Sequence, residues 1–501
     1  MEKESSWDIL YQIDKELVLL EQTAALLEWD EETQMPPDGI DGRSEQISLL
    51  KGYIHDLKSS AEMGAALSAI EEGKLAVTDA QRALIRIYRK EYDDAVKVPK
   101  SLILQLSDAE SKGQNAWVFA RKNNNFKEFE PYLEKIIELK RVYADTVGYI
   151  DHPYNALLNH YEPGMTVARI DALFTPLKHE VVSLMDKIRA CETIDDSFLY
   201  KKYPKEKQDR FGREILHDMG FDFQRAQMCE AVHPFTTTVG ADDVRITTRY
   251  DEPSVSSPLF STIHEGGHGL YELGASNSKT RGTALGEGVS MAIHESQSRL
   301  WENIIGRSDA FWTHYFPIFK RLFPEQLEGI SKESFVRGVN KVESSFIRVN
   351  ADEVTYNLHI IMRYELEKQL IEGSLAVKDL PEAWNTLSEE YLGIIPDGPQ
   401  NGVLQDIHWS AGLIGYFPTY ALGNLYGAQI YHELVKQVPE TVTQFSEGNL
   451  NDASLWLNRE VYLKGSIYTP EDLLKMITGQ ELDSSYFIEY LWSKYKAIYK
   501  W

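Results

Sequence analysis

The stretch STIHEGGHGLYE, residues 261–272, places two histidines four positions apart, with a glutamate directly after the first. Residues i and i+4 share one face of a helix, so the imidazoles of His264 and His268 can hold one metal ion between them. Neutral imidazoles suit Zn²⁺ or Co²⁺. Glu265 lies one step around the helix, where its carboxylate can reach a metal-activated water rather than the metal. The pattern predicts one divalent metal per chain, with Glu265 as the general base of a hydrolysis.

A catalytic zinc needs a third protein ligand and an open fourth position. Two downstream acids compete for this role: Glu287, 19 residues after His268, and Glu295, 27 residues after it. Spacing alone divides them evenly. Glu295 lies in the amphipathic segment 291–303, whereas Glu287 stands between two glycines where a helix is only beginning, and this favours Glu295. His294 beside it is expected to support or pack against the site rather than to bind the metal.

Three residues of the histidine stretch are glycines: Gly266, Gly267 and Gly269. Each costs roughly 1 kcal/mol relative to alanine inside a helix. The expected reason for tolerating this cost is a close approach at that point, either by a ligand or by a crossing helix.

The elements that must position these residues are mostly helices. Apolar residues recur at helical spacing in segment 131–147, with Gly148 at its end, and again in segment 170–188. One segment differs: TTTVGADDVRITTRY, residues 236–250, alternates apolar and polar residues after a turn sequence and predicts a short β-hairpin. Because it ends 14 residues before His264, this small sheet is expected to border the helix that carries the histidines.

Composition sets the broad class. The 501 residues are 43% apolar and 26% charged, as in ordinary folded proteins, and no run of eighteen apolar residues predicts a membrane span. The N-terminus lacks a secretory signal pattern, and two cysteines, Cys191 and Cys229, favour a reducing cytoplasm over a disulfide framework. The net charge of −25 argues against nucleic acid or an anionic membrane as a partner.

Several short motifs occur together in a characteristic order: HPF (233–235), DVRIT (243–247), HEGGH (264–268), HESQ (294–297), IRVNAD (347–352) and GVLQDIHW (402–409). In this order they resemble the carboxypeptidase Taq family of HExxH metallocarboxypeptidases. The early EWDEETQMPP (28–37) is similar to that family's N-terminal signature. The resemblance spans essentially the whole chain.

The resemblance implies a mainly α protein with a large, helical, cleft-bearing fold similar to neurolysin and angiotensin-converting enzyme, and a small β-hairpin or short sheet beside the active site. It implies one peptidase domain over residues 1–501 with a deep groove, whose motifs fall in about 230–420. The implied activity is metal-dependent removal of C-terminal residues from peptides by a cytoplasmic homodimer. The HESQ motif implies Glu295 as the third metal ligand.

Donors for the developing oxyanion are expected in QDIHWSAGLIGYFPTY, residues 405–420. His408 and Tyr416 are eight residues apart and meet if the chain bends at a glycine between them. Similar His and Tyr donors serve in the angiotensin-converting-enzyme-like group, and Tyr420 is a rival for Tyr416. Asp406 is predicted either to orient a histidine or to cap the loop.

A free C-terminal carboxylate is best bound by the planar fork of an arginine. Arg348 of IRVNAD resembles the family's carboxylate-binding arginine, and Arg245 on the predicted hairpin could close one end of the groove. Either could instead form a structural ion pair. His233 of HPF fits a role in holding the substrate backbone, and the edge of the hairpin could pair with an extended peptide. Asp243 and Tyr420 complete the predicted substrate-binding set.

Two other functions stay open at this point. An oligopeptidase would use the same chemistry, and a non-catalytic peptide-binding scaffold would keep the fold alone. The G-x-M-E-N stretch typical of many aminopeptidases does not occur, and all three metal ligands and Glu265 are present, which argues against the scaffold.

Overall fold

The computed structural model describes residues 5–73 and 77–501, and the chain forms two compact units. The first contains Met1–Val96, Asp195–Val339 and Ile430–Glu481, and the second contains Lys97–Ile194, Asn340–Gln429 and Leu482–Trp501. Each unit is assembled from segments that lie far apart in the sequence. The prediction of one domain with a deep groove stays a prediction.

The first unit is helical, with one small sheet. Its helices are α1 (Ser6–Thr33), α2 (Ile40–Lys58), α3 (Ala61–Glu72), α4 (Asp79–Lys97), α9 (Lys205–Asp218), α10 (Ser256–Ala275), α11 (Met291–Arg299), α12 (Asp309–Leu322), α13 (Lys332–Val339), α17 (Thr441–Glu447), α18 (Asn451–Glu460) and α19 (Pro470–Thr478). Its strands are β1 (Ala226–Glu230), β2 (Thr236–Gly240) and β3 (Asp243–Thr248).

The second unit is helical in its described part. Its helices are α5 (Lys100–Lys122), α6 (Glu130–Val147), α7 (Tyr154–Tyr161), α8 (Val167–Arg189), α14 (Thr355–Glu372), α15 (Leu380–Leu392) and α20 (Ser485–Tyr499). Helix α16 (Pro418–Gln437) contributes residues to both units. The prediction of a mainly helical protein is therefore confirmed.

The predicted helices and hairpin are where the sequence placed them. Helix α6 has a proline in its first turn and ends at Gly148, whose φ of 86° places it among the positive-φ glycines. The segment predicted as helical at 170–188 lies within α8. Strands β2 and β3 form the antiparallel hairpin, with an irregular register between Thr238 and Gly240.

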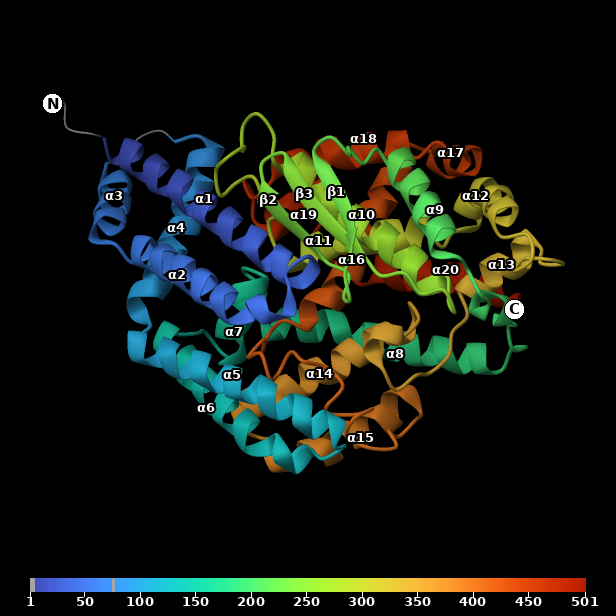
Figure 1. Ribbon diagram of the computed structural model, residues 1–501, viewed down its shortest axis with the longest axis horizontal. Coiled ribbons are helices and arrows are strands. Elements are labelled where there is room, and N and C mark those ends of the chain that lie inside the picture. The colour runs from blue at the N-terminus through green and yellow to red at the C-terminus, as the bar shows by residue number, and fades with distance from the viewer. Residues whose placement is uncertain (1–4, 74–76) are drawn as a thin grey trace. The chain divides into compact units, whose positions relative to one another are not determined.

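The sheet contains one strand that the hairpin pattern did not predict. Its order is β1-β3-β2, with β1 parallel to β3, so β3 is the central strand. The β3 residues Val244 and Ile246 are fully buried. Figure 1 shows the sheet beside α10, and the side chain of Ile246 lies against Gly269 of that helix. The small sheet thus borders the histidine helix, as expected.

The loop between α10 and α11 is anchored in a core of the first unit. Leu285 in this loop packs into a cluster from α1, α3 and α4: Leu10, Ile13, Leu17, Met63, Leu67, Ile70, Ala83, Leu84 and Tyr88. Asp14 of α1, buried in the same region, accepts hydrogen bonds from the backbone N–H of Ala284 and the hydroxyl of Tyr88. Apolar burial and one polar contact therefore fix the chain just before the third predicted ligand.

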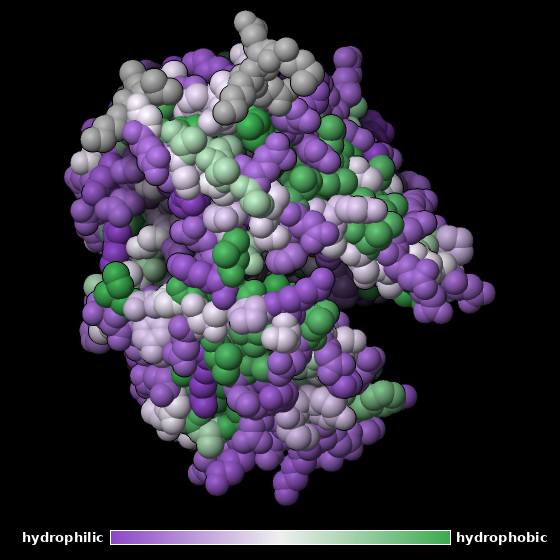
Figure 2. Space-filling model, turned by 90° about the vertical axis from the view of Figure 1, so that its left-hand side faces the viewer, coloured by the Kyte–Doolittle hydropathy of each residue, from purple (hydrophilic) through white to green (hydrophobic). Residues whose placement is uncertain are grey.

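Figure 2 shows a face on which hydrophilic residues predominate, with hydrophobic residues in small groups between them. Scattered exposed apolar residues of this kind are normal for a folded protein. Within the described residues, we find no helix whose length and hydropathy would let it cross a bilayer.

Candidate metal centre

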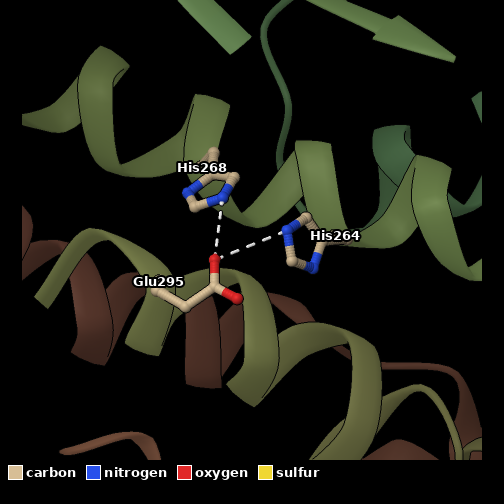
Figure 3. A group of neighbouring side chains, drawn as sticks. All are labelled: His264, His268 and Glu295. Atoms are coloured by element: carbon tan, nitrogen blue, oxygen red, sulfur yellow. Dashed lines mark ion pairs between the residues drawn. The ribbon is translucent and has the colours of Figure 1, made fainter. Parts of the chain in front are cut away.

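Helices α10 and α11 bring the two histidines and one glutamate together. Figure 3 shows both imidazoles turned toward one carboxylate oxygen of Glu295. Oε2 of Glu295 lies 3.6 Å from Nε2 of His264 and 3.4 Å from Nε2 of His268. One ligand atom from each of the three residues lies within 4.8 Å of the others. Glu287, the rival third ligand, is exposed and lies outside this group.

These distances fit a single metal ion. Ligand atoms about 2.0–2.1 Å from a tetrahedral zinc lie roughly 3.4 Å from one another. The two nitrogen–oxygen distances match this spacing. The donor set of two imidazoles and one carboxylate is also that of catalytic zinc sites with an open fourth position. The residues present therefore fit a divalent metal.

A carboxylate fixes the tautomer of His264. Nδ1 of its ring lies 2.9 Å from Oε2 of Glu302, so Nδ1 carries the proton and Nε2 is left for a metal. Glu302 also forms ion pairs with Arg299 and Arg307. Burial raises the pKa of Glu302, but the attraction of Arg299 and His264 outweighs this effect and lowers the pKa to about 2. Glu302 is therefore ionised and accepts a hydrogen bond from the Nδ1–H group of His264.

A second chain of hydrogen bonds fixes His268. Nδ1 of His268 lies 2.5 Å from Nδ1 of His294, and Nε2 of His294 lies 2.7 Å from Oε1 of Glu272. If His294 donates to Glu272, it accepts from His268, and Nε2 of His268 is again left for a metal. Burial, followed by the neighbouring His294, lowers the pKa of His268 to about 3. The ring is therefore neutral, the form that binds metals. His294 supports the site, as expected.

Glu265 is almost completely buried on α10, between the two histidines in sequence. Its Oε2 accepts a hydrogen bond of 2.6 Å from the hydroxyl of Thr236 on β2. Burial raises the pKa of Glu265, and His264 and the Thr236 hydrogen bond only partly oppose this. A carboxylate whose proton affinity is raised in this way is suited to accept a proton from water.

The glycines of the histidine stretch are explained by close packing. A Cβ at Gly267 would lie 2.7 Å from the carbonyl oxygen of Gln297 and 2.9 Å from Cα of Ser298, both in the backbone of α11. A Cβ at Gly266 would meet Leu216, and one at Gly269 would meet Phe221. Of the two expected reasons, a crossing helix is the one observed at Gly267, and this crossing brings Glu295 to the histidines.

The predicted oxyanion donors lie in the second unit, in the loop between α15 and α16. Gly412 and Gly415 have φ of 69° and 97°, so the loop bends at glycines, as predicted. The rings of His408 and Tyr416 have centroids 5.7 Å apart. Nε2 of His408 is 3.1 Å from the hydroxyl of Tyr420, the predicted rival. Burial lowers the pKa of His408 to about 4, so its ring is neutral.

Asp406 was predicted either to orient a histidine or to cap the loop, but its carboxylate instead binds two arginines. Its Oδ1 lies 2.9 Å from Nε and Nη2 of Arg348, and its Oδ2 lies 2.7 Å from Nε and Nη2 of Arg363. Nδ1 of His408 has no hydrogen-bond partner in the described residues. Asp406 therefore orients two arginines rather than a histidine or a loop end. Burial raises its pKa, but the two guanidinium groups lower it by more, and the carboxylate is ionised.

Both candidate arginines are ion-paired. Arg348 is buried and also donates from Nη1 to the hydroxyl of Tyr356. Arg245 on β3 forms two hydrogen bonds of 3.0 and 2.8 Å with Asp243, and its guanidinium lies 4.3 Å from the centroid of the Trp29 ring on α1. Each arginine therefore forms an ion pair within the chain, as the structural alternative expected. Each guanidinium carries five N–H groups, more than these contacts use.

His233 is exposed, and its backbone carbonyl lies 3.5 Å from the hydroxyl of Thr247. Strand β2, whose edge was predicted to pair with a peptide, lies at one end of the sheet order.

Four residues in contact with these sites were not predicted from the sequence: Glu272, Glu302, Arg363 and Glu367. Glu302 lies in a π-helix, Leu300–Ile305, directly after α11. Such insertions occur often at functional sites, but no sequence signal marks this one. Glu272 is four residues after His268, so helical spacing could have placed it on the same face.

An HExxH helix, a glutamate from the next helix and a mainly helical architecture define a metallopeptidase. The model of the carboxypeptidase Taq (M32) metallopeptidase family matches residues 9–495. The chain belongs to this family, and it is therefore a metallocarboxypeptidase, a peptide hydrolase that depends on a divalent metal. The resemblance stated from the motifs is confirmed.

Individual relatives agree with the family model. The chain is 40% identical to carboxypeptidase 1 of Bacillus subtilis, with 95% of each chain covered. It is 37% identical to thermostable carboxypeptidase 1 of Thermus thermophilus over the whole of both chains. The crystal structure of the M32 carboxypeptidase from Deinococcus radiodurans R1 matches with a TM-score of 0.96 at 37% identity, covering 99% of this chain and 100% of that one.

Proposed function

We propose that this chain removes single residues from the C-termini of peptides with Glu265 as general base and His264, His268 and Glu295 as metal ligands. The observation that carries the proposal is the pair of Nε2 atoms that face one oxygen of Glu295 at metal-ligand spacing. Both imidazoles are held in the required tautomer by carboxylate or histidine partners. Glu265 is buried beside them with a raised pKa.

A divalent metal held by these residues supplies Lewis-acid polarisation of water and of the scissile carbonyl. Glu265 accepts the proton of the attacking water on its carboxylate and passes that proton to the departing amine. The Thr236 hydroxyl, bonded to Oε2, holds the carboxylate in one orientation. These steps use one residue as base and then as acid, because the proton that it gains must leave again for turnover.

Tyr416 and His408 are proposed to donate hydrogen bonds to the oxyanion, with Tyr420 as the alternative tyrosine. The hydrogen bond between His408 and Tyr420, and the contact between the rings of Tyr416 and Tyr420, favour a shared network. In this network the Tyr420 hydroxyl orients the His408 ring, and the Tyr416 hydroxyl donates to the oxyanion. Removal of such a donor typically lowers kcat by about 10²–10³-fold. The neutral His408 ring supports donation without adding a charge.

Arg348 is proposed to bind the substrate carboxylate, with Arg245, Asp243, His233 and Tyr420 as further substrate contacts. Arg348 and Arg363 share one carboxylate, that of Asp406, so the three groups together carry one net positive charge. In a chain of net charge −25, such a local excess of cation attracts a free C-terminus. Arg245 keeps N–H groups that Asp243 does not occupy.

The proposal also names the metal, the partners and the assembly. The bound metal is Zn²⁺, with Co²⁺ as an alternative, and the partners are peptides rather than nucleic acid or membranes. The protein is proposed to be a cytoplasmic homodimer whose chain forms one domain with a deep groove. The donor set supports the metal choice, and the acidic charge supports the exclusion of nucleic acid. Sedimentation at several protein concentrations tests the dimer.

Mass spectrometry of a defined peptide tests the activity. The metal-loaded protein should shorten the peptide stepwise from its C-terminus, and the same peptide with a C-terminal amide should be cleaved far more slowly, because it lacks the carboxylate. Internal fragments would indicate an oligopeptidase instead. An unchanged peptide would indicate a non-catalytic scaffold. Removal of metal with a chelator and addition of Zn²⁺ or Co²⁺ separately identifies the ion that restores activity.

A further inference from the structure

Glu367 on α14 is a fully buried acid that the proposed reaction does not use. Its Oε2 accepts hydrogen bonds from the hydroxyl of Tyr154 at 2.6 Å and from the backbone N–H of Gly415 at 2.9 Å. Its Oε1 accepts one of 2.8 Å from Nε1 of Trp409. Three donors therefore converge on one carboxyl group that lies away from solvent.

Two of these donors belong to the loop that carries the proposed oxyanion donors. Trp409 directly follows His408, and Gly415 directly precedes Tyr416. The carboxyl group of Glu367 thus connects the two ends of the segment 409–415. Because the neighbouring residues are joined covalently to these ends, the positions of His408 and Tyr416 depend on this connection.

The loop has little freedom to reach this arrangement in another way. Gly415 has a φ of 97°, which disfavours any residue with a side chain. A Cβ at Gly415 would also lie 2.9 Å from the carbonyl carbon of Leu157 on α7. The backbone N–H of Gly415 is therefore held between α7 and Glu367. The bonded Tyr154 comes from the same helix α7, so one acid fastens the loop to two helices.

Packing alone does not account for a buried acid at this position. An apolar residue of similar volume would fill the space without the cost of burying a carboxyl group. A buried polar group with all its partners in place specifies one conformation of its neighbours. We propose that Glu367 is a positioning residue that sets the spacing of His408 and Tyr416 for catalysis. This inference rests on the proposed role of these two residues as oxyanion donors.

Glu367→Gln tests the inference, and Glu365→Gln is the matched control. Glu365 lies on the same helix, but its carboxylate accepts hydrogen bonds from Lys178 and Tyr391 and, within the described residues, from no group of the loop. The amide of Glu367→Gln offers N–H groups where the loop donates, so at least one of the three hydrogen bonds is lost. Both variants are compared with the wild type for metal content, thermal unfolding, kcat and KM.

The expected result for Glu367→Gln is a fall in kcat of about 10–100-fold, because small misplacements of catalytic groups have effects of this size. KM should stay within about twofold of the wild type, since the interaction concerns the transition state. Metal content should be unchanged, and Glu365→Gln should keep the wild-type kcat. A merely structural role would lower the amount of folded, metal-loaded enzyme and leave kcat per metal site unchanged.

A kcat per metal site equal to that of the wild type, or a fall equal to that of Glu365→Gln, would overturn the inference. If Glu367→Gln does not fold, Tyr154→Phe replaces it, because this variant removes one donor and keeps the buried ring. Tyr154→Phe should then lower kcat with KM unchanged, and a wild-type kcat would count against the inference. Failure of the proposed function is recognised separately, because the wild-type enzyme itself would then leave the free peptide intact.

Discussion

At the scale of single residues, two glutamates near the proposed metal site differ in the direction of their pKa shifts. Glu265 is buried, Glu302 is partly buried, and both lie near His264, yet the pKa of the first is raised and that of the second is lowered. Burial prevails at Glu265 and raises its pKa, whereas Arg299 and His264 prevail at Glu302 and lower its pKa. These environments support the proposed role of Glu265 in proton transfer and suit Glu302 to orient His264, a proposed metal ligand.

Replacement of Glu265 by glutamine separates catalysis from metal binding. Because the amide cannot accept a proton, kcat should fall by about 10²–10⁴-fold. The three metal ligands are untouched, so the variant should bind one metal ion per chain with the wild-type affinity. Metal analysis and peptide hydrolysis measure the two effects. A variant that keeps most of the wild-type kcat would refute Glu265 as the base.

Replacement of Glu302 by glutamine should have the converse effect. The neutral amide accepts the hydrogen bond from Nδ1–H of His264 more weakly than the carboxylate does, so metal affinity should fall by about 10–100-fold. Competition with a chromophoric chelator measures this affinity. Glu272→Gln, which acts on His268 through His294, should give a loss of similar size. Wild-type affinity in both variants would show that these carboxylates do not orient the ligands.

Glu367 makes the stability of the protein depend on pH. Its pKa rises from 4.5 to about 7 because burial disfavours the charge, and the nearby titratable or charged groups are Tyr154, Tyr161 and Arg363. The folded state therefore holds the proton more tightly than the unfolded state. This contribution is fully present below the unfolded pKa and is lost as the pH rises through about 7.

The matching measurement compares the wild type with Glu367→Gln between pH 4.5 and 8. The free energy of unfolding of the wild type, relative to that of the variant, should fall by roughly 3 kcal/mol across this range. Denaturant titrations at several pH values give this difference, and other titrating groups cancel because both proteins contain them. A difference independent of pH would contradict the raised pKa of Glu367.

At the scale of elements, the crossing of α10 and α11 decides whether a metal can be held. The two histidines come from one helix and Glu295 from the other, so their distances depend on how closely the helices approach. Gly267 faces the backbone of α11, where a Cβ would lie 2.7 Å from the carbonyl oxygen of Gln297. Backbone cannot move aside as a flexible side chain can, so the helices themselves would have to separate.

Gly267→Ala should therefore weaken metal binding and destabilise the fold by about 1–3 kcal/mol. Gly52→Ala on α2 is the matched control, because nothing lies within 4 Å of a Cβ at that helical position. Alanine there should stabilise the protein by up to about 1 kcal/mol. Unfolding titrations and metal affinity measure both variants. Equal effects of the two substitutions would show that the helix crossing tolerates a methyl group.

Some parts of the candidate site could be predicted from the sequence, and others could not. His264, His268 and Glu265 were predicted because the spacing of residues on one helix is fixed by local geometry. Between Glu287 and Glu295, spacing decided nothing; the resemblance implied Glu295, and the structure groups Glu295 with the two histidines. The partners of Asp406 were predicted wrongly, since Arg348 and Arg363 reach it from 58 and 43 residues away.

Contacts of this kind have no local signal in a single sequence. The same holds for Glu367, whose donors lie 213, 48 and 42 residues away. Strand β1 was missed for a related reason, because it pairs in parallel with β3 and is not part of a hairpin. The helices α6 and α8 and the hairpin were predicted because periodicity and end signals act within a few residues.

At the scale of the whole molecule, metal binding is linked to folding. The three proposed ligands come from two helices of the first unit and are brought together only in the folded state. A ligand that binds the folded state alone stabilises it by an amount that grows with the logarithm of its concentration, about 2.7 kcal/mol at one hundred times Kd. Removal of the metal should therefore lower the Tm, and Zn²⁺ should raise it again in a concentration-dependent way.

The dependence of Tm on metal concentration distinguishes this site from adventitious binding. His264→Ala should abolish the rise in Tm, because it removes one of the three ligands. His217→Ala is the matched control, since this histidine lies on α9 of the same unit with 82% of its side chain exposed. It should retain the full rise. A rise that persists in His264→Ala would place the stabilising ion elsewhere, and the site of α10 and α11 would then lose its proposed metal.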